Sequence, residues 1–210
     1  MKLKYRSVLS SVVVLVTLML AATANATPIE YVATLSGARE VPPNASPGTG
    51  SVTAIFDLAV HTLDLHVTFS DLTAGTTASH IHAPTLAPFS GKAGVATQVP
   101  FFTGFPIGVT SGTYDRTFNT LDPLFYNPAF LAANGGTAAS AEAAFAQALA
   151  EGKAYLNIHT ENFPSGEIRG FLRVASVPDA TSSLLCLSIC LISLEMFRRK
   201  FRRKPGLDSQ

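Results

Sequence analysis

Cysteine, tryptophan and charged residues are scarce in this chain. Its 210 residues include two cysteines and no tryptophan, and only 14% are Asp, Glu, Lys or Arg. Both cysteines, Cys186 and Cys190, lie near the C-terminus. The region before them therefore has no disulfide framework and no cysteine to act as a metal ligand or nucleophile. The low charge, combined with 47% hydrophobic residues, excludes a disordered chain.

Sequence signatures of catalysis are missing as well. The chain has no glycine-rich phosphate-binding loop and no Gly-x-Ser-x-Gly motif. Its formal net charge of +1 argues against general nucleic-acid binding. Residues 27–178 carry six basic and eleven acidic residues, a net charge of −5, whereas each end of the chain carries +3. The sequence therefore predicts a mildly acidic, non-catalytic domain between two basic ends.

The N-terminal segment has the three parts of a secretory signal peptide. Residues 1–6 are basic, residues 8–22 are apolar, and Ala24-Asn25-Ala26 offers small residues for cleavage. We therefore predict a signal peptide at residues 1–26 and an exported mature chain. An uncleaved membrane anchor is the alternative.

A second hydrophobic segment lies near the C-terminus and precedes a basic cluster. Residues 180–197 are long enough for a transmembrane helix, and six Lys or Arg residues follow between positions 198 and 204. By the positive-inside rule, the C-terminus lies in the cytoplasm and the preceding domain lies outside. A buried C-terminal helix of the domain is the alternative.

Residues 177–204 resemble a bacterial sorting signal. Val177, Pro178 and Asp179, with the hydrophobic segment and the basic cluster, are similar to the Val-Pro-Asp variant of the PEP-CTERM class. The resemblance implies attachment to the cell envelope, at least transiently, and an exosortase-type processing enzyme as a partner. Residues 205–210 are then a short tail.

Alternating hydrophobic and polar residues dominate the region between the two ends. Leu63, Leu65 and Val67 share one face of an extended segment, which is typical of a half-buried antiparallel strand. The predicted strands are residues 31–35, 51–58, 62–70, 79–82, 95–101, 112–118, 154–159 and 167–174, and the predicted helical segments are residues 122–133 and 140–151. The fold class is therefore all-β, an antiparallel sandwich or barrel with a short helical insertion.

Three segments of this region resemble the CHRD domain, which is named after chordin, an animal extracellular antagonist of growth factors. Residues 35–43 are similar to its opening motif, Ser79-His80-Ile81-His82 to its central His-x-His motif, and residues 154–170 to its closing signature. On this resemblance we assign residues 27–176 to a CHRD domain. The resemblance implies an extracellular binding or structural module.

Two histidines of the central motif suit a metal ion. His80 and His82 leave the same face of a predicted strand, because side chains two residues apart point the same way. Imidazoles at this spacing can ligate Zn²⁺ or Cu²⁺. The family pairing implies that His159, at the end of another strand, joins them. Glu167 or Glu161 could then orient a ring or act as a fourth ligand.

A polar network without metal is the alternative for these histidines. In that interpretation their ring nitrogens bond to backbone carbonyls and to Asn157, Thr160 and Glu167, and so lock the loops. Glu167 and Arg169 lie two residues apart in the last predicted strand. We expect them to form an ion pair, or Arg169 to reach a carboxylate on the next strand.

One further segment and two further histidines are expected to have no role in a functional site. Residues 40–43 contain two prolines, which cannot donate ladder hydrogen bonds, and are expected to form an extended edge segment. His61 and His66 are expected to face solvent outside any cluster.

Three functions remain open from the sequence. The prediction is an exported, non-catalytic module of the cell surface or extracellular matrix, whose partner is an extracellular protein or polysaccharide and to which the sequence assigns no certain cofactor. The first alternative is a copper or zinc protein that uses His80, His82 and His159. The second is a superoxide dismutase-like enzyme and sandwich, since the His-x-His strand is similar to the copper strand of Cu/Zn superoxide dismutase.

Overall fold

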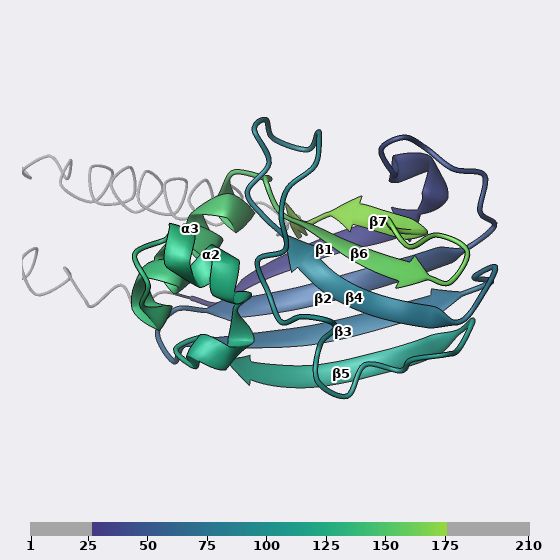
Figure 1. The fold of residues 1–210 in the computed structure, drawn as a ribbon. Coiled ribbons are helices and arrows are strands. Elements are labelled where there is room, and N and C mark those ends of the chain that lie inside the picture. Colours follow the sequence, from purple (N-terminus) through teal and green to yellow (C-terminus); the bar gives the residue numbers. More distant parts are fainter. Residues whose placement is uncertain (1–26, 176–210) are drawn as a thin grey trace, which may run out of the picture. The chain divides into compact units, whose positions relative to one another are not determined.

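The computed structural model describes residues 27–175. Within them, eight strands form one antiparallel sheet in the order β4-β6-β7-β1-β2-β3-β5, and β8 also pairs with β1 (Figure 1). The strands are β1 (Ile29–Ser36), β2 (Thr49–Asp57), β3 (Thr62–Ser70), β4 (Thr76–His82), β5 (Gly112–Asn119), β6 (Tyr155–Thr160), β7 (Ile168–Phe171) and β8 (Arg173–Val174). The helices are η1 (Gly37–Arg39), η2 (Pro123–Phe125), α2 (Pro128–Ala133) and α3 (Ala138–Ala150).

Several predictions fall outside the described residues. They are the signal peptide at residues 1–26, the sorting signal at 177–204 with its membrane helix at 180–197, and the tail at 205–210. These features and their boundaries with the domain stay predictions. Among the helices of residues 27–175, none is long and apolar enough to cross a membrane.

The sheet is built from the alternation that the sequence shows. Leu65 and Val67 of β3 are no more than 2% exposed, and they pair in register with Ala54 and Val52 of β2. Fully burying one such side chain contributes about 1.5–3 kcal/mol, so a one-residue slip in register would be costly. The prediction of an antiparallel all-β fold is confirmed.

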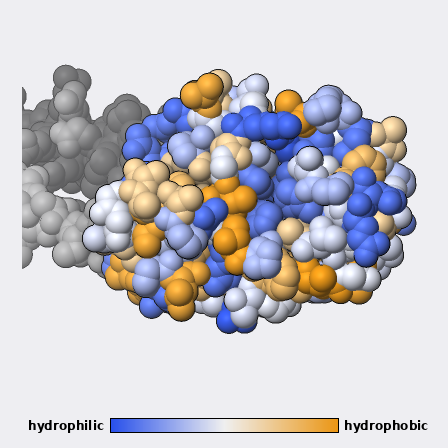
Figure 2. Space-filling model, viewed as in Figure 1, coloured by the Kyte–Doolittle hydropathy of each residue, from blue (hydrophilic) through white to orange (hydrophobic). Residues whose placement is uncertain are grey.

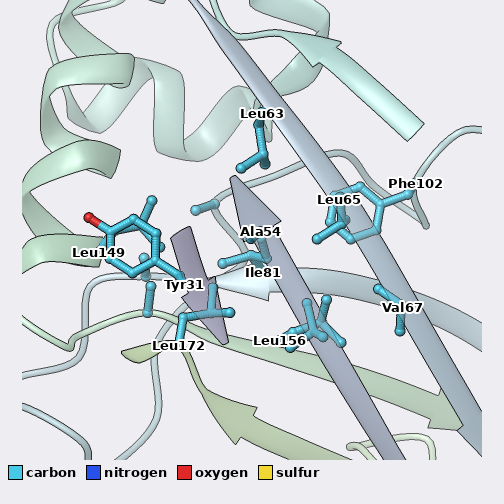
Figure 3. Packing of buried hydrophobic residues seen from close by; sticks show 14 of the residues in the cluster. Tyr31, Ala54, Leu63, Leu65, Val67, Ile81, Phe102, Leu149, Leu156 and Leu172 are labelled. Carbon is cyan, nitrogen blue, oxygen red and sulfur yellow. The ribbon is translucent and has the colours of Figure 1, made fainter. Parts of the chain in front are cut away.

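The sheet curves so that strands from its two ends share one core. Ile81 of β4 and Leu156 of β6 belong to the same hydrophobic cluster as Ala54 and Leu65 (Figure 3). Phe102, from the long connection between β4 and β5, completes this part of the cluster and is fully buried. Residues that alternate with these core positions on β4 and β6 point to the opposite face of the sheet.

Helices α2 and α3 lie together at one end of the sheet (Figure 1). Thr137 caps α3 reciprocally with Ser140, each side chain bonding to the backbone N–H of the other. This capping box starts the helix at Ala138, two residues before the predicted start. Phe145 is fully buried and packs edge-on against Phe56 and Phe125, with ring centroids 6.0 Å apart in both pairs.

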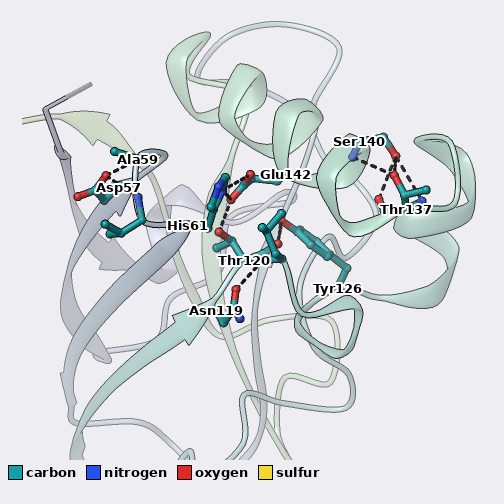
Figure 4. Close-up of polar contacts among 11 residues, drawn as sticks. Asp57, Ala59, His61, Asn119, Thr120, Tyr126, Thr137, Ser140 and Glu142 are labelled. Atoms are coloured by element: carbon teal, nitrogen blue, oxygen red, sulfur yellow. Dashed lines mark hydrogen bonds and ion pairs between the residues drawn. The ribbon is translucent and has the colours of Figure 1, made fainter. Parts of the chain in front are cut away.

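A buried carboxylate fastens α3 to the sheet. Glu142 is 5% exposed, accepts a hydrogen bond from Thr120 Oγ1, and lies 2.9 Å from His61 Nδ1 (Figure 4). His61 is part of no group of potential metal ligands in the described part of the chain and its side chain is 42% exposed, as expected, but it bonds to a buried partner that was not expected. Its partner lies 81 residues away along the chain, beyond the reach of local sequence patterns.

Residues 95–101 do not form the predicted strand. They make only isolated bridges, from Val95 to His82 and from Thr97 to Tyr126. The backbone of Ala96 bonds to β4 through its N–H and to Asn127 through its carbonyl, so the segment divides its bonds between two neighbours and builds no continuous ladder. It instead covers the free edge of β4. The last predicted strand, residues 167–174, is interrupted between β7 and β8.

Candidate metal centre

Three histidines from two neighbouring strands converge on one face of the sheet. His80 and His82 lie on β4, and His159 lies on β6, where it is paired with Ala78. One potential ligand nitrogen of each ring lies within 4.8 Å of those of the other two. The closest ring centroids, those of His80 and His159, are 5.0 Å apart.

Backbone carbonyls hold each ring through one of its two nitrogens. His80 Nε2 donates to the carbonyl of Pro100 at 2.7 Å, His82 Nδ1 to that of Ala93 at 2.9 Å, and His159 Nδ1 to that of Pro164 at 2.9 Å. A carbonyl only accepts hydrogen bonds, so each of these nitrogens carries the proton of its neutral ring. The other nitrogen of each ring is then unprotonated and has a lone pair available for a ligand.

These other nitrogens lack hydrogen-bond partners among the described residues. They are Nδ1 of His80, Nε2 of His82 and Nε2 of His159, and all three are buried. Metal–nitrogen bonds of about 2.0–2.1 Å place three ligand nitrogens roughly 3.3–3.6 Å apart. Because the ligand nitrogens lie within 4.8 Å of one another, binding an ion requires them to approach by at most about 1.5 Å.

Burial keeps the three imidazoles in the form that binds metals. Desolvation, with the proximity of the other rings, lowers the pKa of His80 to about 4. Desolvation also lowers the pKa of His82 to about 4 and lowers that of His159. All three rings are therefore neutral at pH 7, and the neutral imidazole is the ligand for transition metals.

Two loops supply the carbonyls that orient the rings. Ala93 and Pro100 belong to the long connection between β4 and β5, which extends away from the sheet and returns across it (Figure 1). Pro164 belongs to the turn between β6 and β7. Tyr155 adds a stacked contact, with its ring 4.8 Å from that of His82 and an interplanar angle of 2°. Tyr155 was not predicted as a site residue, although it alternates with Asn157 and His159 on β6.

Glu167 does not contact the histidines through a hydrogen bond. Its carboxylate accepts from Ser46 Oγ, from the backbone N–H of Thr73 and from Thr160 Oγ1, which ties three segments together. It also forms no ion pair with Arg169. The reason is local: Glu167 precedes β7, and its side chain turns toward Thr160 at the end of β6.

Arg169 reaches a carboxylate in the segment that was expected to form an extended edge. Its Nε lies 3.8 Å from Oε2 of Glu40, and both residues are buried, at 2% and 6% exposure. Burial raises the pKa of Glu40 to about 7, against the opposing effect of Arg169. The backbone at Glu40 is extended, as expected for residues 40–43, but its side chain is buried. The helix η1 turns that residue inward, and no local pattern reveals a partner 129 positions away.

Asn157 shares the face of the histidines. It pairs with His80 on one side and with Arg169 on the other, and its Oδ1 is buried without a hydrogen-bond partner among the described residues. The polar layer therefore runs across three strands, from β4 through β6 to β7.

A shallow hollow on the outer face of β2, β3 and β5 is a weaker candidate. Its lining residues are Thr53, Ile55, Asp64, Leu65, His66, Asp115, Arg116 and Thr117. His66 bonds to Asp115, but their side chains are 48% and 69% exposed, so solvent weakens their interaction. On the face seen in Figure 2, hydrophobic and hydrophilic residues are interspersed in small groups, without one large hydrophobic patch. The three-histidine centre is the better-built site.

The model that describes the CHRD-domain family matches residues 31–172. The match covers more than half of the chain and includes all three histidines, Glu40 and Arg169. The chain therefore belongs to the CHRD-domain family. Comparisons with curated proteins and with solved structures returned no match.

Proposed function

We propose that this CHRD-domain protein is an exported, non-catalytic module that binds a transition-metal ion, zinc or copper, through His80, His82 and His159. The observation that carries the proposal is the convergence of three buried imidazoles, each with one nitrogen fixed by a carbonyl and the other without a partner.

A polar network without metal explains the contacts of only one of the two nitrogens in each ring. The carbonyl bonds of Ala93, Pro100 and Pro164 account for one nitrogen of each ring. Leaving a buried polar atom without a partner costs about 1–3 kcal/mol, and here three such atoms occur together. A bound ion offsets that cost, because it takes the lone pair of all three nitrogens at once.

The hydrogen bonds from the histidines to the carbonyls are of the kind found around metal-ligating histidines in general. A ligating histidine usually donates its second N–H to a neighbouring acceptor, which fixes the tautomer and the ring orientation. The three protein ligands leave a coordination position for a further ligand, and when bound the ion supplies a fixed positive charge and a link between β4, β6 and their loops.

The membership in the CHRD-domain family supports an extracellular setting for this module. In the proposal, residues 1–26 direct export, and residues 180–197 hold the chain in the cell envelope with its C-terminus in the cytoplasm. An exosortase-type enzyme processes the signal at Val177-Pro178-Asp179. The partner of the acidic domain is an extracellular protein or polysaccharide rather than a nucleic acid. Mass spectrometry of the chain isolated from cells tests both ends, and an unprocessed, cytosolic chain contradicts this part.

Metal titration of the full chain tests the function directly. After treatment with a chelator, the chain should bind one equivalent of Zn²⁺ or Cu²⁺. His80→Ala should lower the affinity at least 100-fold, because it removes one of three ligands. His66→Ala is the matched control, since His66 lies on the outer face of the sheet, and it should bind as the unchanged chain does. Equal binding by the His80→Ala chain would refute the site.

A further inference from the structure

The ligands of the candidate metal centre bring no negative charge to an ion. In residues 27–175, the group of converging ligand residues consists of His80, His82 and His159 and contains no Asp or Glu. The second nitrogen of each ring donates its hydrogen bond to a neutral carbonyl and not to a carboxylate. Asn157, which pairs with His80 on this face, is neutral as well.

The centre is also removed from water. The three histidines are 6%, 8% and 9% exposed, and their free nitrogens are buried. The Born cost of moving an ion into a low-dielectric interior rises with the square of its charge, so it is roughly four times larger for a divalent than for a monovalent ion of the same size. In a buried, neutral ligand set, this larger cost falls on a divalent ion with no ligand charge to offset it.

A fixed positive charge lies one aromatic ring away from the ligands. The Arg169 guanidinium lies over the ring of Tyr155, 4.7 Å from its centroid, and the same ring stacks on that of His82. Glu40 neutralises this charge only in part at pH 7, because its burial favours the protonated carboxyl. Repulsion from Arg169 again weighs twice as heavily on a divalent ion.

From these charges we infer that the three-histidine site prefers a monovalent d¹⁰ ion, Cu⁺, over Zn²⁺. The inference rests on the proposed metal-binding function and adds the charge of the ion to it. Imidazole nitrogen is a suitable ligand for copper as well as for zinc, so the charge of the surroundings decides between them. Ag⁺, a monovalent d¹⁰ ion that needs no reducing agent, should bind at the same three nitrogens.

One isosteric substitution adds a negative charge beside the three histidines without changing the ligands themselves. Asn157→Asp places a carboxylate on the histidine face, opposite His80 in the β4–β6 register. We expect it to raise the affinity for Zn²⁺ relative to Cu⁺ at least tenfold. Glu40→Gln removes a negative charge from the other side of Arg169 and should shift the same ratio in the opposite direction at pH 8, where the Glu40 carboxyl is ionised.

The experiment measures both affinities on the metal-free full chain. Cu⁺ is titrated without oxygen against bicinchoninate, Zn²⁺ against a chromophoric chelator, and Ag⁺ by calorimetry, for the unchanged chain and both variants. Circular dichroism checks the fold of each variant. The expected result is a higher affinity for Cu⁺ than for Zn²⁺ and opposite shifts of their ratio in the two variants.

The other outcomes separate the two proposals. If none of these three ions binds, and Cu²⁺ does not bind either, the proposed function fails. If Zn²⁺ binds at least as tightly as Cu⁺, the metal site stands and the preference for a monovalent ion is overturned. If Cu⁺ binds more tightly but neither folded variant shifts the ratio, the electrostatic basis of the inference is overturned.

Discussion

Each histidine of the centre divides its two nitrogens between the backbone and the space that the three rings share. The protonated nitrogen stabilises a loop, and the unprotonated one is free for an ion. A substitution that keeps the hydrogen bond to the loop but removes the unprotonated nitrogen should therefore weaken metal binding with little effect on folding stability. Asn offers this at position 159, because its side-chain amide can donate to Pro164 as Nδ1 of His159 does.

We predict that His159→Asn lowers metal affinity at least 100-fold and costs the metal-free chain only about 1 kcal/mol of unfolding free energy. His159→Ala removes both functions and should cost about 1–2 kcal/mol more, because the Pro164 carbonyl loses its donor. Metal titration and urea denaturation of both variants check the prediction. Normal metal affinity in the His159→Asn chain would show that this nitrogen is not a ligand.

Glu40 makes stability depend on pH in a direction unusual for a carboxylate. Its folded pKa of about 7 lies above the ordinary value of 4.5, so the folded chain holds a proton that the unfolded chain releases first. The free energy of unfolding should therefore fall as pH rises from 4.5 to 7. Relative to Glu40→Gln, the loss is roughly 2–3 kcal/mol at 1.36 kcal/mol per pKa unit.

Denaturation of the unchanged chain and of Glu40→Gln at several pH values between 4 and 8 measures this difference. Glu30→Gln, at an exposed position of β1, serves as the control and should follow the unchanged chain at every pH. A difference between Glu40→Gln and the unchanged chain that stays constant over this range would contradict the prediction.

Sequence reasoning finds the residues of the centre unequally well. The spacing of His80 and His82 places both on one face of a strand, because alternation in a strand is a local property. His159 needed the family resemblance, since its approach to them depends on the pairing of β4 with β6. Glu40 was missed because its burial depends on Arg169, far away in the chain.

At the scale of elements, the turn between β6 and β7 positions the third histidine and Asn157. Gly166 in this turn has a φ of +123°, and a Cβ built there would lie 2.5 Å from Nδ2 of Asn157. A side chain at this position must therefore displace Asn157 or the turn that carries the Pro164 carbonyl.

We predict that Gly166→Ala costs about 2–3 kcal/mol of stability and weakens metal binding, because steric conflict adds to the cost of the backbone conformation. Gly136→Ala is the matched control: its φ is +74°, but a Cβ there meets no atom within 4 Å. It should cost about 1 kcal/mol and leave metal affinity unchanged. Thermal denaturation and metal titration compare the two, and equal effects would contradict a special role for this turn.

The elements themselves follow from the sequence where their pattern is local. The alternation in β2 and β3 and the alanine-rich composition of α3 are sufficient to predict them, although the Thr137 cap starts α3 two residues before the predicted start. Residues 95–101 alternate in the same manner but form no strand, because their backbone bonds are shared between Ile81 and the segment around Tyr126. Which segments accept these backbone hydrogen bonds depends on the rest of the fold, so the sequence pattern of residues 95–101 does not reveal it.

On the scale of the whole molecule, the centre lies where two strands, the long β4–β5 connection and the β6–β7 turn meet. Metal ligands come from β4 and β6, and the carbonyls that orient them come from the β4–β5 connection and the β6–β7 turn. Binding energy is therefore coupled to the folding of the entire domain, because none of these parts forms the site alone. An ion that binds only the folded chain must raise its stability.

The size of this effect follows from mass action. At a free ion concentration 100 times the dissociation constant, stabilisation is about 2.7 kcal/mol. For a domain of this size, that raises the melting temperature by roughly 5–10 °C. We expect this shift for the unchanged chain and for His66→Ala, reversal by a chelator, and no shift for His80→Ala. Calorimetry or near-ultraviolet circular dichroism on heating records it. An equal shift in the His80→Ala chain would place the stabilising ion elsewhere, because that variant lacks one of the three nitrogens that must hold it.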